Sequence, residues 1–110
     1  MERLLIKSKI AIRNDKFRES LIQDQTHRLY STDLVNSHDK REAILQAVRE
    51  FDGFNDDNDP HEEHDFGMVL VEGEKFYFKC DYYDLNLEYG ADPSEVEYCV
   101  VLTIMGVREY

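Results

Sequence analysis

A change in the spacing of the apolar residues near residue 66 constrains the fold of this chain more than any other feature. From Phe66 onward, large apolar residues such as Phe66, Met68 and Leu70 recur at every second position, which is the spacing of a β-strand. The segment Glu72-Gly73-Glu74 interrupts the pattern and predicts a turn between two strands of a hairpin. We expect the apolar face of this hairpin to consist of Phe66, Met68 and Leu70 on the first strand and Phe76, Phe78, Cys80 and Tyr82 on the second.

The first half of the chain has helical spacing instead. Apolar residues that recur every three to four positions, with Lys and Arg between them, predict an amphipathic helix over about residues 3–20. A second apolar stripe predicts a helix over about residues 40–52, which Gly53 ends. At its start, Asp39 and Glu42 have the spacing of a capping box, in which each side chain bonds the other residue's amide.

Two further segments have β character. Residues 28–32 predict a short strand or an ordered connection, and Val96–Met105 is rich in β-branched residues on both faces, which is typical of a central strand. Helices that pack on one face of a small sheet would bury this set of side chains. We therefore expect an α+β fold, with two helices on one face of a small antiparallel sheet of three to four strands, in a single domain over residues 1–110.

The charge of the chain is unevenly distributed. The formal net charge is −11, but residues 1–50 have a balance of +2 and residues 51–110 a balance of −13. The densest segment is Asp52–Asp65, with seven carboxylates and no Lys or Arg. A protein that binds nucleic acid directly must neutralise phosphates, so this composition argues against such a function and favours a basic partner.

The remaining composition indicates a cytoplasmic protein. Cys80 and Cys99 lie in apolar surroundings without the spacing of a metal or redox motif, which predicts free, buried thiols in a reducing compartment. The apolar stretch near Met1 is too short for a signal peptide. The longest apolar run, Cys99–Val107, is far shorter than the roughly 20 residues of a membrane-spanning helix.

Histidines and carboxylates near Pro60 invite a metal-site interpretation. His61 and His64 stand three apart, whereas the zinc metalloprotease motif needs a spacing of four on a helix. The segment from Asp57 begins like a calcium-binding loop, but it lacks the glycine and the final glutamate of that motif. We expect no cofactor. A looser cation or acid/base cluster would combine Asp59, His61, His64, Asp65, Asp81 and Asp84, although turns, caps and solvated charges are the more ordinary explanation for any one of these residues.

Several short blocks of the sequence form a recognisable pattern: Asp57-Asn58-Asp59-Pro60, Glu63-His64-Asp65-Phe66-Gly67, Asp81-Tyr82-Tyr83-Asp84, Leu87-Glu88-Tyr89-Gly90 and Leu102-Thr103-Ile104-Met105 with Glu109-Tyr110. Together they resemble domain-of-unknown-function family 3768, small proteins of proteobacteria and their mobile elements, and Asn14-Asp15 and Phe17-Arg18 also fit. The resemblance implies a domain of this size and a mobile-element setting, without an assigned activity. This chain has Glu62 where the family pattern has glycine, which adds a carboxylate to the acidic segment.

Size, charge and the resemblance together lead to our main functional hypothesis, a non-enzymatic phage or mobile-element inhibitor of a bacterial defence complex. It would act as a DNA mimic of the anti-CRISPR or anti-restriction type, with carboxylates such as Asp57 and Asp59 presented in a phosphate-like row to a DNA-binding subunit. Two alternatives remain, a metal-dependent hydrolase that uses His61, His64, Asp65, Asp81 and Asp84, and an acidic interaction module for another basic partner. The expected partner-binding residues are Asp56, Asp57, Asp59, Glu62, Glu63, Asp65, Asp81, Asp84, Glu88 and Asp92.

Overall fold

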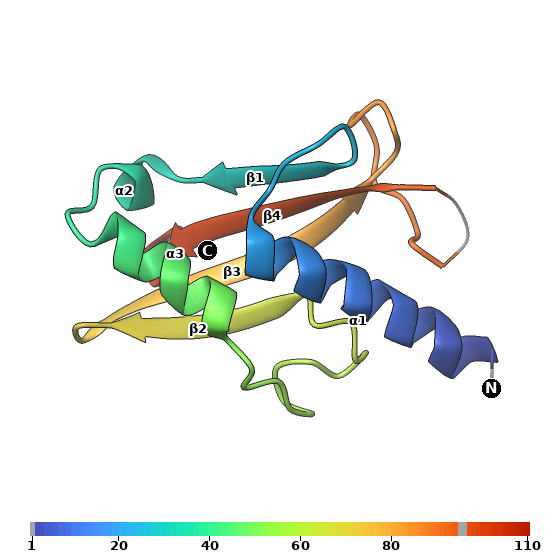
Figure 1. Cartoon of the computed structure of the whole chain (residues 1–110), viewed down its shortest axis with the longest axis horizontal. Helices are drawn as coiled ribbons and strands as arrows, with labels where there is room; N and C mark the ends of the chain where they lie inside the picture. The colour runs from blue at the N-terminus through green and yellow to red at the C-terminus, as the bar shows by residue number, and fades with distance from the viewer. Residues whose placement is uncertain (1, 95–96) are drawn as a thin grey trace.

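The structure is a computed structural model, and it describes residues 2–94 and 97–110, with side chains from residue 9 onward. Within these residues the chain forms three α-helices, four strands and a short 3₁₀ helix (Figure 1). In chain order they are α1 (Glu2–Ser20), β1 (His27–Ser31), α2 (Asp33–Asn36), α3 (Arg41–Glu50), β2 (Phe66–Val71), β3 (Glu74–Tyr83), β4 (Cys99–Gly106) and η1 (Val107–Glu109). Neither α1 nor any other described helix is both long and apolar enough to cross a membrane.

The strands form one sheet in the order β1-β4-β3-β2, and α1 and α3 lie side by side on one of its faces (Figure 1). The predicted α+β class is confirmed, but the sheet is mixed rather than antiparallel. β2, β3 and β4 pair antiparallel, whereas β1 pairs parallel with β4. The long connection from β1 to β4, which passes through two helices and a hairpin, lets the two strands run in the same direction.

The core lies between the helices and the sheet. Phe17 of α1 and Ile44 and Val48 of α3 pack against the inward face of β3 and β4, where Phe76 and Phe78 are fully buried. The predicted inward face of the second hairpin strand and the central position of the last strand are therefore confirmed. Both cysteines are free and buried, as expected.

The predicted face of β2 is wrong by one residue. Met68 and Leu70 are 42% and 61% exposed, whereas Gly67 and Val69 are buried. Residues directly opposite in an antiparallel pair share a face, and Gly67 and Val69 lie opposite the buried Phe78 and Phe76. The turn at Glu72 and Gly73, both with positive φ, fixes this register.

The ends of two predicted elements also differ from the structure. The capping box is absent, because α3 begins after Lys40, which makes no side-chain cap, and Asp39 is exposed. His38 instead accepts a hydrogen bond from the Lys40 amide at 3.0 Å through its Nδ1 atom. β4 begins at Cys99, and the predicted strand start at Val96 lies outside the described residues.

Candidate functional site

The segment between α3 and β2, residues 51–65, is called the acidic loop below. Its first part is held by hydrogen bonds between side chains and the backbone. The Asn55 carboxamide oxygen accepts from the amides of Asp57 at 2.9 Å and Asn58 at 3.1 Å, and the Asn58 side chain bonds the backbone of Asn55 and Gly53 in return. These bonds replace the missing secondary structure and give the loop a defined shape.

Asp59 fixes the second part of the acidic loop. Its side chain is only 4% exposed, and its Oδ1 atom accepts from the amides of Glu63 at 2.9 Å and His64 at 3.1 Å. The expected row of Asp57 and Asp59 does not form, because the backbone turns here and Asp59 points inward. Asp59 is thus a buried acceptor for the loop backbone.

A buried polar network joins the loop to α1 and β3. Asn14 of α1 is fully buried, and its Nδ2 atom donates to the Glu63 carbonyl at 3.0 Å and to the Tyr82 hydroxyl at 2.9 Å. The Tyr82 hydroxyl in turn donates to the Glu63 carboxylate at 2.8 Å. Burial raises the pKa of Tyr82 well above its ordinary value, so the phenol keeps its proton and stays a donor. Glu63 is therefore engaged in holding the loop.

His64 forms the second attachment of the loop to α1. Its Nδ1 atom lies 3.0 Å from both carboxylate oxygens of Asp15, and its Nε2 atom lies 3.7 Å from Asp59. The imidazole stacks on Phe54 with ring centroids 4.1 Å apart. Arg18 is buried, and its guanidinium lies 5.1 Å from the centre of the Phe54 ring. It donates to the Asp15 carboxylate at 2.8 Å and to the Phe51 carbonyl at 3.1 Å.

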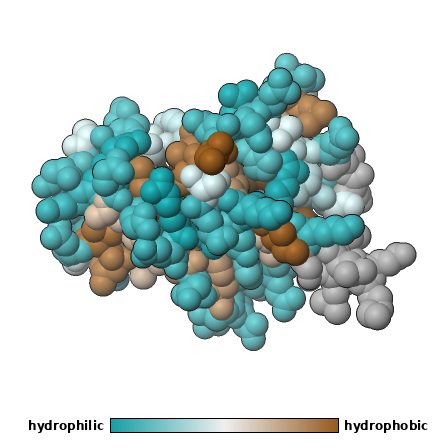
Figure 2. Space-filling model, in the orientation of Figure 1, coloured by the Kyte–Doolittle hydropathy of each residue, from teal (hydrophilic) through white to brown (hydrophobic). Residues whose placement is uncertain are grey.

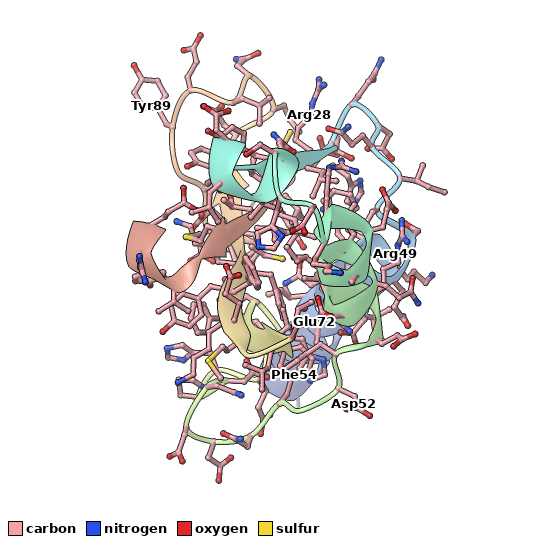
Figure 3. The ribbon with its side chains drawn as sticks, turned by 90° about the vertical axis from the view of Figure 1, so that its left-hand side faces the viewer. Arg28, Arg49, Asp52, Phe54, Glu72 and Tyr89 are labelled. Atoms are coloured by element: carbon pink, nitrogen blue, oxygen red, sulfur yellow. The ribbon has the colours of Figure 1, made fainter. Side chains whose placement is uncertain are left out.

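The carboxylates that remain free to meet a partner lie at the outer side of this scaffold. The side chains of Asp56, Asp57 and Glu62 are exposed, and so is that of Asp52, which is not among the residues expected from the sequence. Figure 3 shows Asp52 reaching outward, whereas Phe54 lies inside the molecule beside α1. No Lys or Arg occurs from residue 51 to residue 74, so no cation of the loop neutralises these groups.

The other expected partner-binding residues lie elsewhere. Asp84 and Asp92 accept hydrogen bonds from their own loop, and Glu88 and Asp92 are exposed there. Asp81 is paired with Lys79 at 3.0 Å. In Figures 1 and 3 this β3–β4 loop lies at the opposite edge of the molecule from the acidic loop, so the ten residues do not form one continuous patch.

The expected cation cluster is not assembled in the described part of the chain. Within residues 2–94 and 97–110, no group of three or more His, Cys, Asp or Glu side chains has the arrangement of metal ligands. His61 is exposed on the acidic loop, and His64 is turned towards Asp15. The two histidines therefore do not converge on a common site with Asp65.

Asp65 carries an unfavourable charge at the start of β2. Burial and the neighbouring Glu63 carboxylate raise its pKa above the ordinary value. A raised pKa means that the ionised form costs the folded state free energy at neutral pH, and that protonation removes this cost as the pH falls.

We expect Asp65→Asn to raise the free energy of unfolding at pH 7 by roughly 0.5 kcal/mol, a small effect because water still screens a half-buried group. Urea unfolding across pH should show the gain disappear under acidic conditions, and a gain that persists there would contradict this reason.

The sequence patterns do not reveal the contribution of α1. They predict only an amphipathic helix around Asn14, Asp15 and Arg18, yet Asn14 and Arg18 are among the few buried polar residues of the described chain. Asn14 and Asp15 lie far from the acidic loop in sequence, yet both contact it in the structure.

Comparison with known proteins identifies the family. The family model described as "Protein of unknown function (DUF3768)" matches residues 25–109, which is most of the chain. No curated protein and no solved structure gives a significant match. The matched region contains the acidic loop and the whole sheet, whereas the α1 residues that hold the loop precede it. The chain therefore belongs to the DUF3768 family.

Proposed function

We propose that this protein binds a basic surface of a partner protein through the exposed carboxylates of the acidic loop, Asp52, Asp56, Asp57 and Glu62. One observation carries the proposal: these groups project from a loop whose backbone is fixed by Asn55, Asn58 and Asp59. A loop that is already ordered loses little conformational entropy on binding, so more of the electrostatic attraction is retained as affinity.

The more specific form of the proposal is DNA mimicry. The partner surface would be the cationic DNA-binding surface of a bacterial defence complex, of the CRISPR or restriction type, and the protein would block target DNA. The absence of Lys and Arg from residues 51–74 and the net charge of −11 support this form, because opposite fields accelerate encounter with a surface built to hold phosphates. The more general alternative is an interaction module for a basic surface that binds no DNA.

The test uses two variants of equal charge. The loop variant combines Asp52→Asn, Asp56→Asn, Asp57→Asn and Glu62→Gln, and the control combines Glu19→Gln, Glu72→Gln, Glu88→Gln and Glu97→Gln, all at exposed positions outside the loop. The native protein would capture its partner from lysates of bacteria that carry CRISPR and restriction systems, and affinity would be measured at low and high salt. We expect the loop variant to bind about tenfold more weakly, and the control to bind within about twofold of the native protein.

Three results would count against the proposal. Equal losses in both variants would indicate a general effect of net charge, and full binding by the loop variant would show that the interface lies elsewhere. An affinity that does not change with salt would exclude an electrostatic interface. Displacement of a labelled DNA duplex from the captured partner separates the two forms, because a mimic competes with DNA and a general interaction module does not.

A further inference from the structure

A groove unrelated to the acidic loop lies beside the second half of α1. It has a volume of about 500 Å³ and is bounded by α1 and by the segment that joins α1 to β1. Its apolar part includes Phe17, Ile12 and Ile22, of which the two isoleucines are 54% and 72% exposed. Figure 2 shows hydrophobic atoms at the surface over α1 and over the segment that follows it, within a mainly hydrophilic face. Large exposed apolar side chains around a concave surface are typical of a binding site.

Three cations border this groove, on a protein with a net charge of −11. Lys9, Arg13 and Lys16 are spaced by four and three residues, which places them along one side of the helix. No carboxylate lies within ion-pair distance of them among the side chains described from residue 9 onward. The local charge of the groove is therefore opposite to that of the whole chain.

Arg13 is held in a fixed position at the groove. Its guanidinium donates to the Tyr98 carbonyl at 3.0 Å and lies 4.2 Å from the centre of the Tyr98 ring. Its Nε atom donates to Nε2 of His27 at 3.0 Å, which leaves Nδ1 as the ring nitrogen that faces Asp24. The Oδ1 atom of Asp24, the only carboxylate among the groove's described residues, lies 2.8 Å from this Nδ1 atom. The hydrogen bond with His27 lowers the pKa of Asp24 to about 2, and Asp24 stays ionised without an ion pair to the lysines.

We propose that this groove binds a small anionic ligand with an apolar body, such as a medium-chain carboxylate. The carboxylate would lie among Lys9, Arg13 and Lys16, and the hydrocarbon would cover Ile12, Phe17 and Ile22. The volume is within the usual range of small-molecule sites. The net charge of the protein cannot attract such a ligand, because a chain with a charge of −11 repels anions except at a local cluster of cations.

The test compares three ligands that share one eight-carbon chain and differ only in the head group. Octanoate, 1-octanol and octylammonium would each be titrated into the full chain by calorimetry, with the chemical shifts of the backbone amides recorded in parallel. We expect octanoate to bind one to one and about tenfold more tightly than octanol, and octylammonium to bind more weakly than octanol. The shifted amides should belong to residues 9–27.

Variants at exposed positions locate the site without disturbing the core. Lys16→Glu should weaken octanoate about tenfold, whereas Lys75→Glu, an identical change at an exposed lysine of β3 outside the groove, should not alter it. Ile22→Ser should weaken octanoate and octanol by the same factor, since it removes only apolar contact. Absence of octanoate binding, equal affinity for octanoate and octanol, or equal losses in the two lysine variants would each overturn the proposal. Binding of a glutamate-rich peptide in place of octanoate would also overturn it, in favour of a protein partner.

Discussion

Replacing Gly67 with alanine is expected to lower the free energy of unfolding by about 3 kcal/mol. Gly67 lies on the inward face of β2, directly opposite Phe78. A methyl group there would be 2.5 Å and 2.6 Å from two carbons of the Phe78 ring and 2.9 Å from the Phe51 ring. Contacts this short do not occur between real carbon atoms, so both rings must move, and the fully buried Phe78 has little space to do so.

The displacement should also reach the acidic loop. Phe51 packs against Phe54 with ring centroids 4.8 Å apart, and Phe54 stacks on His64. Urea unfolding of the variant would measure the loss of stability, and amide hydrogen exchange would report on the loop. Gly90→Ala is the matched control, because its nearest neighbour is 3.9 Å away, and its stability should lie within about 0.5 kcal/mol of the native protein. A Gly67→Ala protein as stable as the native protein would show that the rings can move freely.

The sequence predicts the fold correctly where the apolar residues follow a single spacing. The helices expected over about residues 3–20 and 40–52 correspond to α1 and α3, since their apolar stripes have helical spacing and no competing pattern. The inward face of β2 could not be found in this way, because Phe66–Val71 is apolar at almost every position and both frames fit. Only the pairing with β3, which depends on the turn at Glu72 and Gly73, decides between them.

Composition alone predicts the acidic segment, but the burial of its side chains decides which of the carboxylates can meet a partner. The number of carboxylates between residues 52 and 65 marks the segment, but charge alone does not distinguish an exposed aspartate from a buried one that accepts backbone hydrogen bonds. Asp57 and Asp59 illustrate this difference, since they are two residues apart and have opposite orientations. The attachment through Asn14, Asp15 and Arg18 depends on contacts between residues 33 to 49 positions apart, which local patterns do not contain.

Asp59→Ala is expected to lower the free energy of unfolding by about 3 kcal/mol and to release the acidic loop. The substitution leaves the amides of Glu63 and His64 without their acceptor in a partly buried place, and hydrogen bonds to an ionised acceptor are stronger than neutral ones. The removal of a buried charge offsets only part of this loss, because the Asp59 carboxylate also lies 3.7 Å from the His64 ring.

Two further substitutions separate the role of the Asp59 acceptor from that of charge. Asp59→Asn keeps a side-chain oxygen for the two amides, so it should cost about 1 kcal/mol, whereas Asp57→Ala removes an exposed carboxylate and should leave stability within about 0.5 kcal/mol of the native value. Urea unfolding measures the three effects, and hydrogen exchange at the Glu63 and His64 amides should accelerate most in Asp59→Ala. If Asp57→Ala and Asp59→Ala changed the stability equally, the loop would not depend on its buried aspartate. The expected order instead means that the exposed carboxylates can be changed without loss of the scaffold, which allows partner binding to be tested separately from folding.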